Sequence, residues 1–524
     1  MTRKKQSIAI TALISIFLLM NQITGSAKTS TDLSKESIIP KPVSITATGG
    51  SFTLKSSTVI YVQGESGELK QIAQYLADRL KPATGFDIKV KTTLKAPKSA
   101  IYLTLAGADS KLGKEGYELT ISKKLLKLSA NSPEGLFRGI QTIRQILPAK
   151  IELAAKQEGP WKIATGTIID YPDYSYRGVM LDVSRHFFGV GDIKRFIDLI
   201  AYYKINALHL HLSDDQGWRI EIKSWPNLTA HGGSTQVGGG KGGYYTQEQY
   251  SDIVKYAKER YMIIVPEIDM PGHTNAALAS YAELNCSGKA TELYTGTRVG
   301  FSSLCTTQEI TYKFLGDVIR ELSAITPGPY IHIGGDESNS TKKEDYIPFV
   351  NRVQEIVVAN GKQVIGWDDI SIATIKPNSI AQHWSNVKNA NAAVGQGAKI
   401  IMSPARKAYL DMQYDKTTKL GLHWAAYIEI DSAYTWNPAT IIPGVKKENI
   451  LGVEAALWTE TITKMDEIEY MVFPRLPGIA EVGWTASPAR KWDEYKLRLA
   501  KHGERFKAME IDYYQSKLVP WNKE

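Results

Sequence analysis

The chain from about residue 174 onward is patterned as short apolar runs that recur at intervals of tens of residues. Runs of this length, rich in β-branched residues and bounded by polar ones, predict buried strands. Eight such strands are predicted, namely Tyr176–Val183, Ile205–Leu212, Met262–Ile268, Tyr330–Ile333, Gln363–Trp367, Ile380–Trp384, Lys399–Met402 and Leu451–Leu457.

Amphipathic stretches with helical spacing separate the earlier strands. They cover Asp192–Tyr203, Gln247–Arg260 and Gln308–Ile325. Eight strands alternating with helices predict a (β/α)8 TIM barrel, here over residues 171–524. Catalytic residues of such barrels lie at the C-terminal ends of the strands.

Residues 28–170 predict a separate small α/β domain ahead of the barrel. The segment mixes β-rich runs with two helical patterns and offers no cluster of catalytic residue types, so we interpret it as an accessory domain. The predicted elements are strands at Ser57–Val62, Ala100–Leu105 and Tyr117–Ile121 and helices at Leu69–Leu80 and Gly135–Leu147.

Residues 1–27 have the pattern of a secretory signal peptide. Three basic residues precede an apolar run, Ile8–Met20, and the small residues Gly25-Ser-Ala27 follow it. The apolar run is short for a membrane span, which leaves an uncleaved anchor as the alternative. We expect a secreted or periplasmic protein that has no membrane contact after cleavage.

The composition is that of a globular protein, with 43% hydrophobic and 22% charged residues. The formal net charge of +9 is spread along the chain without an arginine-rich block, so no nucleic-acid partner is expected. Cys286 and Cys305 are the only cysteines. In an oxidising compartment they predict one disulfide bond.

Polar and aromatic residues gather at one end of nearly every predicted barrel strand, which a barrel serving only as a scaffold does not need. We therefore expect an active site there. The strand-end segments are Asp182-Val-Ser-Arg185-His186, Ser213-Asp214-Asp215, Glu267-Ile-Asp269-Met-Pro-Gly-His273, Asp336-Glu337, Trp367-Asp368-Asp369, Trp384, Tyr409-Leu-Asp411 and Trp458-Thr-Glu460.

The centre of this predicted site is the segment Tyr330-Ile-His-Ile-Gly-Gly-Asp-Glu337. A strand runs into two glycines that deliver the adjacent carboxylates of Asp336 and Glu337. Neighbouring residues of a regular strand point to opposite faces, so a bend at the glycines is needed to bring both carboxylates into one pocket. Taken alone, the pair is equally compatible with a solvated loop.

Tryptophans accompany the carboxylates. Trp367, Trp384, Trp424 and Trp458 all fall in the later half of the predicted barrel, three of them at strand ends. Indole faces suit sugar rings, because axial C–H groups pack well against the π cloud. One tryptophan near a strand end is usually part of the core, but four beside carboxylates favour a carbohydrate site.

A metal-dependent barrel hydrolase such as a deacetylase is the alternative. His209 and His211 are two apart on a strand, hence on one face, and His-x-His is a familiar metal pair. The nearby acidic residues are explained equally well by a hydrogen-bonding network, so no metal is expected. The glycine-rich segment 238–243 does not open a helix after a strand, and we interpret it as a loop rather than a nucleotide site.

Four ordered motifs resemble the family 20 glycoside hydrolases, the β-N-acetylhexosaminidases. The resemblance covers the whole chain after the leader, because those enzymes also place a small α/β domain before the barrel. The motifs are Arg177-Gly-Val-Met-Leu-Asp-Val-Ser-Arg-His186, His209-Leu-His-Leu-Ser-Asp-Asp-Gln-Gly-Trp218, Glu267-Ile-Asp-Met-Pro-Gly-His273 and His332-Ile-Gly-Gly-Asp-Glu337.

The resemblance implies a substrate-assisted, retaining mechanism in which the 2-acetamido group of the sugar replaces the enzyme nucleophile. By similarity, Glu337 is the general acid and base, Asp336 holds the acetamido N–H and stabilises the oxazolinium intermediate, and Tyr409 donates to the acetamido carbonyl. No cofactor is implied.

The remaining roles implied by the resemblance concern substrate binding. Arg185 and Glu460 would hold the 3- and 4-hydroxyls and Asp411 the 6-hydroxyl. Asp214 and His273 would form a hydrogen-bonded chain behind Glu337, with Asp269 supporting His273 and His332 also in a supporting role. The tryptophans of the pocket would be Trp367, Trp384, Trp424 and Trp458.

The expected partners are glycans or oligosaccharides that end in N-acetylglucosamine or N-acetylgalactosamine, cleaved one terminal sugar at a time. A carbohydrate-binding protein that has lost turnover is a further alternative, although binding alone does not require an acid pair. The sequence leaves open the preference between the two sugars, the natural polymer and the oligomeric state.

Overall fold

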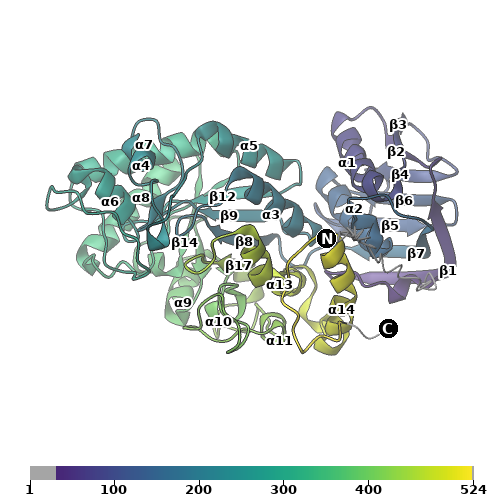
Figure 1. Cartoon of the computed structure of the whole chain (residues 1–524). Coiled ribbons are helices and arrows are strands. Elements are labelled where there is room, and N and C mark those ends of the chain that lie inside the picture. Colours follow the sequence, from purple (N-terminus) through teal and green to yellow (C-terminus); the bar gives the residue numbers. More distant parts are fainter. Residues whose placement is uncertain (1–30, 522–524) are drawn as a thin grey trace, which may run out of the picture.

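A computed structural model describes residues 31–521, which form two bodies side by side (Figure 1). The smaller body, at the right of Figure 1, is a sheet with two helices, and the larger is a closed barrel. The predicted leader, residues 1–27, lies outside the described residues. None of the helices within residues 31–521 is long and apolar enough to cross a membrane.

The small domain is a mixed seven-stranded sheet in the order β1-β7-β5-β6-β4-β2-β3. Helices α1 (Gly67–Thr84) and α2 (Pro133–Ile146) pack on it. The strands are β1 (Ser44–Leu54), β2 (Val59–Gln63), β3 (Lys89–Thr93), β4 (Ala100–Thr104), β5 (Tyr117–Ile121), β6 (Leu125–Ala130) and β7 (Trp161–Asp170).

The three strands and two helices predicted here are present, but the sequence patterns missed four strands of the small domain. Two of them, β1 and β3, are the edges of the sheet and have few or no buried residues. An edge strand carries polar residues on much of its surface, so it lacks the apolar run that identifies a central strand.

The larger body is a parallel barrel closed in the order β12-β13-β14-β15-β16-β17-β8-β9. All eight predicted strands are present within two residues of their expected ends, and the TIM-barrel prediction is confirmed. Their bounds are β8 (Tyr176–Asp182), β9 (Ala207–His211), β12 (Ile263–Glu267), β13 (Tyr330–His332), β14 (Gln363–Trp367), β15 (Ile380–His383), β16 (Lys399–Met402) and β17 (Ile450–Leu457).

Amphipathic helices cover the outside of the barrel (Figure 1). In α3 (Val190–Tyr202), for example, Ile193, Phe196, Ile197 and Ile200 are buried at helical spacing. The other helices are α4 (Asn227–Ala230), α5 (Gln247–Lys258), α6 (Asn275–Ser280), α7 (Glu309–Ile325), α8 (Lys343–Ala359), α9 (Val387–Gly395), α10 (Ala405–Ala408), α11 (Ile430–Tyr434), α12 (Met465–Val472), α13 (Arg475–Trp484) and α14 (Trp492–Ala508).

The connections after the strands contain the predicted site residues. Between β16 and β17 the α-helices α10 and α11 are short, and much of the connection is irregular. This long connection contains Tyr409, Asp411 and Trp424. A short hairpin after β9, made of β10 (Ser213–Asp214) and β11 (Gly217–Trp218), contains Asp214.

Buried ion pairs join the two bodies at the end of the barrel where the strands begin. The Glu115 carboxylate of the small domain accepts from Arg177 of the barrel at 2.6 Å and from Arg138 of its own domain at 2.9 Å. Lys204 pairs with Asp170 at 2.7 Å. Removing either partner of such a pair leaves a buried charge uncompensated, so these contacts hold the domains in one arrangement.

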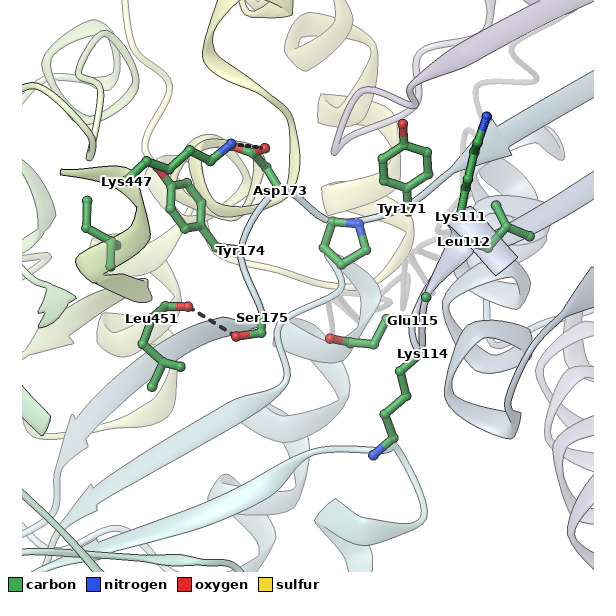
Figure 2. Close-up of a pocket in the computed structure, with 13 residues that line it drawn as sticks. Lys111, Leu112, Lys114, Glu115, Tyr171, Asp173, Tyr174, Ser175, Lys447 and Leu451 are labelled. Atoms are coloured by element: carbon green, nitrogen blue, oxygen red, sulfur yellow. Dashed lines mark hydrogen bonds and ion pairs between the residues drawn. The ribbon is translucent and has the colours of Figure 1, made fainter. Parts of the chain in front are cut away.

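A cleft of about 430 Å³ lies between the bodies at this end (Figure 2). Much of its charged lining is already paired: Lys447 contacts Asp173 at 2.6 Å, Glu115 holds two arginines, and Ser175 donates to the Leu451 carbonyl. The cleft is at the opposite end of the strands from the predicted catalytic residues, and we do not assign chemistry to it.

The disulfide prediction is confirmed. Cys286 and Cys305 are bonded, with their Cα atoms 4.8 Å apart. The bridge ties the connection after α6 to the segment before α7.

Candidate active site

The two glycines after β13 form the expected bend. The backbone at Gly334 has φ +61° and that at Gly335 has φ +103°, both in the region that favours glycine. Glu337 follows with φ +47°, which is uncommon for a residue with a side chain and is typical of functional positions. The bend turns both carboxylates of the following pair toward the same histidine, as described below.

Gly334→Ala is expected to destabilise the protein more than the backbone angle alone explains. An added Cβ would lie 1.8 Å from the Asp269 carboxylate, so the turn must shift. We expect the free energy of unfolding to fall by about 1–3 kcal/mol more than in the control variant, measured by chemical denaturation. The matched control is Gly361→Ala, because Gly361 has φ +73° but open space around it. Equal losses in the two variants would contradict this account.

His273 lies close to both carboxylates of the pair. Its Nε2 lies 3.4 Å from Oε2 of Glu337 and 3.9 Å from Oδ2 of Asp336. Its Nδ1 lies 3.2 Å from Oδ1 of Asp214. Asp214, His273 and Glu337 therefore lie in the predicted order, with a hydrogen bond between Asp214 and His273 and a close contact between His273 and Glu337.

The two carboxylates have different surroundings. Asp336 is buried, whereas the Glu337 side chain is 34% exposed. Burial, reinforced by the neighbouring charges of Glu337 and Asp369, raises the pKa of Asp336 to about 7, although His273 opposes the shift. Burial disfavours the charged form of His273, but Asp214 and Asp269 outweigh it and raise the pKa of the imidazole well above its usual value.

Asp269 and His332 occupy positions behind the pair. The Asp269 charge favours protonated His273, but its hydrogen bond goes to the Gly335 N–H at 3.0 Å, so Asp269 supports the bend rather than the imidazole directly. His332 accepts from the Gly334 N–H at 3.0 Å and packs against Trp367. Both residues therefore fix the turn that presents Asp336 and Glu337.

A series of aromatic rings in mutual contact lies near Asp336. Trp367 packs on Trp458 with centroids 5.8 Å apart, and Trp458 on Tyr409 at 6.3 Å. Tyr409 in turn contacts Trp424 at 6.1 Å, which lies 6.2 Å from Trp384. We call these five residues the aromatic cage.

Members of the aromatic cage differ in depth. Trp367 and Tyr409 are fully buried, Trp384 and Trp458 partly, and Trp424 is 56% exposed, so Trp424 lies at the mouth rather than in the wall. Burial and the charges of Asp336 and Asp411 raise the pKa of Tyr409 well above its ordinary value. Its phenol keeps its proton and can donate a hydrogen bond.

Arg185, Asp411 and Glu460 surround the other part of the pocket. Arg185 is held by Asp214 at 2.8 Å and its guanidinium lies 4.8 Å from the centre of the Trp458 ring. Burial and the charge of Glu460 raise the pKa of Asp411 well above its usual range. Burial also raises the pKa of Glu460, against the attraction of Arg185.

Several buried polar atoms here have no hydrogen-bond partner among residues 31–521. They include Oδ1 of Asp336, both carboxylate oxygens of Asp411, and Nε of Arg185. Unpaired buried polar atoms are costly and uncommon in proteins. Gathered beside an aromatic cage, they form a surface suited to a ligand with many hydroxyl and amide groups.

The structure adds site residues that sequence reasoning did not single out. The Trp384 indole N–H donates to Asp369 at 2.9 Å, and that of Trp367 donates to Glu267 at 2.9 Å. His211 lies 2.8 Å from Asp214. The available signal was a polar residue at an interior position of a strand, since such a residue needs a partner from a neighbouring strand.

His209 and His211 belong to a carboxylate network rather than to an isolated metal pair. His209 lies 2.8 Å from Glu454 and 2.9 Å from Glu267, and His211 lies 2.6 Å from Glu267. Both ring nitrogens of each histidine therefore face carboxylate oxygens. Ligand-type atoms of His209, Glu267 and His332 do lie within 4.8 Å of one another, so metal independence stays a prediction.

Exhaustive chelation is expected to leave activity unchanged, because carboxylate oxygens already lie close to both ring nitrogens of His209 and of His211. The measurement is turnover of a chromogenic N-acetylglucosaminide before and after dialysis against a chelator. Loss of activity that zinc restores would instead support the metal-dependent alternative.

Two family models match this chain. The model for the glycosyl hydrolase family 20 catalytic domain matches residues 174–487, and that for domain 2 of the same family matches residues 35–171. The first match alone covers more than half of the chain. The chain belongs to glycoside hydrolase family 20. The family predicted from the four motifs is confirmed.

Curated and solved family 20 proteins resemble the chain over most of its length. The β-N-acetylhexosaminidase of Cellulomonas fimi is 41% identical over 488 residues, which is 92% of this chain and 97% of that protein. The family 20 β-N-acetylhexosaminidase of Streptomyces coelicolor A3(2) superposes with a TM-score of 0.90 at 49% identity, covering 93% of this chain and 99% of that one.

A Streptomyces plicatus N-acetyl-β-hexosaminidase in complex with Thio-NAglucal also gives a TM-score of 0.90, at 50% identity over 93% of this chain and 98% of that one. A mutant of the Streptomyces plicatus enzyme was solved with its product, GlcNAc. This family 20 chain is a glycoside hydrolase, and the alternative of a binding protein without turnover is not supported.

Proposed function

We propose that this family 20 hydrolase is an exo-acting, retaining β-N-acetylhexosaminidase that removes terminal N-acetylglucosamine or N-acetylgalactosamine by substrate-assisted catalysis. The observation that carries the proposal is the convergence of Asp336 and Glu337 on His273 beside an aromatic cage that contains a protonated phenol, Tyr409. The Streptomyces plicatus complex with GlcNAc supports the sugar class.

Asp336 and Tyr409 act on the acetamido group. The Asp336 carboxylate accepts the amide N–H, and Tyr409 donates to the carbonyl oxygen, which aims that oxygen at C1. When the oxygen attacks C1, positive charge spreads over the resulting oxazolinium ring. A buried anion beside that charge stabilises it strongly because little water screens the attraction.

Glu337 moves the proton. It gives its proton to the glycosidic oxygen as the bond from C1 to that oxygen breaks, and the free alcohol leaves. A water molecule then attacks C1 from the side that the leaving group vacated, while Glu337 takes a proton from it. The acetamido group is restored and the anomeric configuration is retained. The partial exposure of Glu337 suits this role, since leaving group and water both reach it from the opening.

The rest of the pocket fits one terminal sugar. Arg185 and Glu460 would hold the 3- and 4-hydroxyls, and the unpaired carboxylate of Asp411 the 6-hydroxyl. Trp458, beside Arg185, offers its face to the ring. With its 3-, 4- and 6-hydroxyls held by these buried side chains, the terminal sugar leaves no room for another sugar attached at the 4-position. The enzyme would therefore remove sugars only from the non-reducing end.

One assay tests the proposal. The wild-type protein is incubated with the 4-nitrophenyl β-glycosides of N-acetylglucosamine, N-acetylgalactosamine and glucose. We expect release of nitrophenol from the first two and essentially none from the glucoside, because it lacks the acetamido group. The first-formed sugar should be the β-anomer by NMR. Comparable hydrolysis of the glucoside, or an α-product, would refute substrate assistance.

Secretion or a periplasmic location is part of the proposal. The bonded Cys286 and Cys305 support an oxidising compartment, and the pattern of residues 1–27 supports export. N-terminal sequencing of the protein from its native host tests it, with a mature start just after Ala27 as the expected result.

A further inference from the structure

Glu267 is a charged group inside the barrel that lies behind both halves of the site. It is the last residue of β12 and is fully buried. Strand register places it opposite His211 of β9 and His332 of β13. Side chains at the same level of neighbouring parallel strands share one face, so the barrel itself brings these groups together.

The two oxygens of Glu267 hold different parts of the site. Oε1 accepts the indole N–H of Trp367 at 2.9 Å, and Trp367 is the deepest tryptophan of the aromatic cage. Oε2 lies 2.6 Å from Nδ1 of His211. One carboxylate therefore links the cage to the interior histidines.

From His211, a series of contacts leads to Glu337, the proposed catalytic acid. Nε2 of His211 lies 2.8 Å from Asp214, Asp214 lies 3.2 Å from His273, and His273 lies 3.4 Å from Glu337. Carboxylates and imidazoles alternate along this path. Each imidazole can donate through both nitrogens and each carboxylate can accept through both oxygens, so every contact has a donor and an acceptor.

Charge favours this arrangement. Burial alone would raise the pKa of Glu267, but the imidazoles of His332, His211 and His209 outweigh it and hold the pKa well below its usual value. Burial opposes charge on His211 as well, yet Glu267 and Asp214 raise its pKa well above the ordinary value. With an anion at Glu267 and a cation at His211, the imidazolium donates to a carboxylate on each side, to Glu267 through Nδ1 and to Asp214 through Nε2.

We infer that Glu267 is a positioning residue for the reaction: through Trp367 it sets the floor of the acetamide pocket, and through His211, Asp214 and His273 it sets the orientation of Glu337. The inference rests on the proposed function and extends it. Because Nε2 of His273 lies 3.4 Å from Oε2 of Glu337, Oε1 is the oxygen left to face the leaving group.

Glu267→Gln tests this role, because it keeps the shape but replaces one acceptor oxygen by a donor, so either Trp367 or His211 loses its acceptor. Two substrates with the same terminal sugar are compared. N,N′-diacetylchitobiose needs full protonation of its leaving group, and the 4-nitrophenyl glycoside needs little. We expect kcat for chitobiose to fall about 10²-fold and kcat for the nitrophenyl substrate clearly less, with KM nearly unchanged.

Glu454→Gln is the matched control. Glu454 is equally buried in the barrel and contacts His209 at 2.8 Å, Gln382 at 2.8 Å and Tyr176, but contacts no member of the cage or of the acid pair. We expect kcat of Glu454→Gln on both substrates to stay within about twofold of wild type. Its thermal stability should fall as in Glu267→Gln, because both variants remove a buried charge partner.

The positioning role would be overturned if folded Glu267→Gln kept the wild-type kcat on both substrates. It would also be overturned if Glu267→Gln and Glu454→Gln lost the same share of kcat on both substrates. If Glu267→Gln does not fold, Glu267→Asp keeps the charge but shortens its reach by one methylene. The same leaving-group dependence is then expected, and its absence counts against the inference. A folded wild type that cleaves neither substrate refutes the proposed function itself.

Discussion

Replacing Glu337 by glutamine is expected to lower kcat for N,N′-diacetylchitobiose by about 10²–10⁴-fold, the usual contribution of general acid–base catalysis. Glutamine keeps the shape of the side chain but cannot give a proton to the glycosidic oxygen. Because only a proton transfer is lost, KM should change little and the fold should be intact. Steady-state kinetics and circular dichroism measure the two effects.

The leaving group gives this prediction its specificity. A nitrophenolate departs without protonation, so the first step on the 4-nitrophenyl glycoside should survive in Glu337→Gln better than the step on chitobiose. Glu344→Gln is the control, since Glu344 is an exposed glutamate at the start of α8 and should leave both rates unchanged. Near wild-type cleavage of chitobiose by Glu337→Gln would remove Glu337 from the role of acid.

Asp336→Asn is expected to lower kcat by about 10²–10³-fold on both substrates, by analogy with the loss of one electrostatic stabiliser. The asparagine amide cannot supply the negative charge that stabilises the oxazolinium ring, and this need does not depend on the leaving group. The two variants therefore give different patterns: Glu337→Gln discriminates between substrates and Asp336→Asn does not. A nitrophenyl rate that Asp336→Asn leaves intact would contradict the role of Asp336 in cyclisation.

The pH dependence of Asp336 follows from the same role. Its pKa of about 7 in the free enzyme means that the required anion is lost as the pH falls below that value. We expect kcat/KM of the wild type to decrease on the acid side of about pH 7. This decrease should be absent from the residual activity of Asp336→Asn, measured across the same buffers. An unchanged acid limb in the variant would assign that limb to another group.

Stability supplies a control for the same variant. The folded pKa of Asp336 is about 7 and its ordinary value is 3.8, so the folded state binds the proton more tightly than the unfolded state. Ionisation therefore costs stability as the pH rises from about 4 through 7, on the order of a few kcal/mol once complete. Asp336→Asn should accordingly melt no lower than wild type at pH 8. Its loss of activity then reflects chemistry rather than unfolding.

Much of the fold follows directly from periodicity. The barrel strands are buried on both sides, so they appear as continuous apolar runs, and all eight were predictable. The small domain was predicted less completely because β1 and β3 are exposed edges. Tyr409 and Asp411 lie on the irregular connection after β16, where only the motif resemblance assigns them roles.

The candidate site, too, was predictable from the sequence in part. The sequence predicted one cluster made of Asp336, Glu337, Asp214 and His273. In the structure, His273 lies within hydrogen-bonding or ion-pair distance of each of the other three. The partner of Asp269 was not predictable, because its hydrogen bond goes to a backbone N–H whose direction depends on the Gly335 torsion angle.

The sequence by itself determined which barrel strands exist, which residues end them, and the family, because those properties depend on residue type and spacing along one segment. Only the tertiary structure decided which carboxylate is buried, that Trp424 lies at the mouth, and that Glu267 links Trp367 to His211. Burial and hydrogen-bond partners depend on atoms supplied by other strands. The register and closure of the barrel place those atoms, and no single segment contains that information.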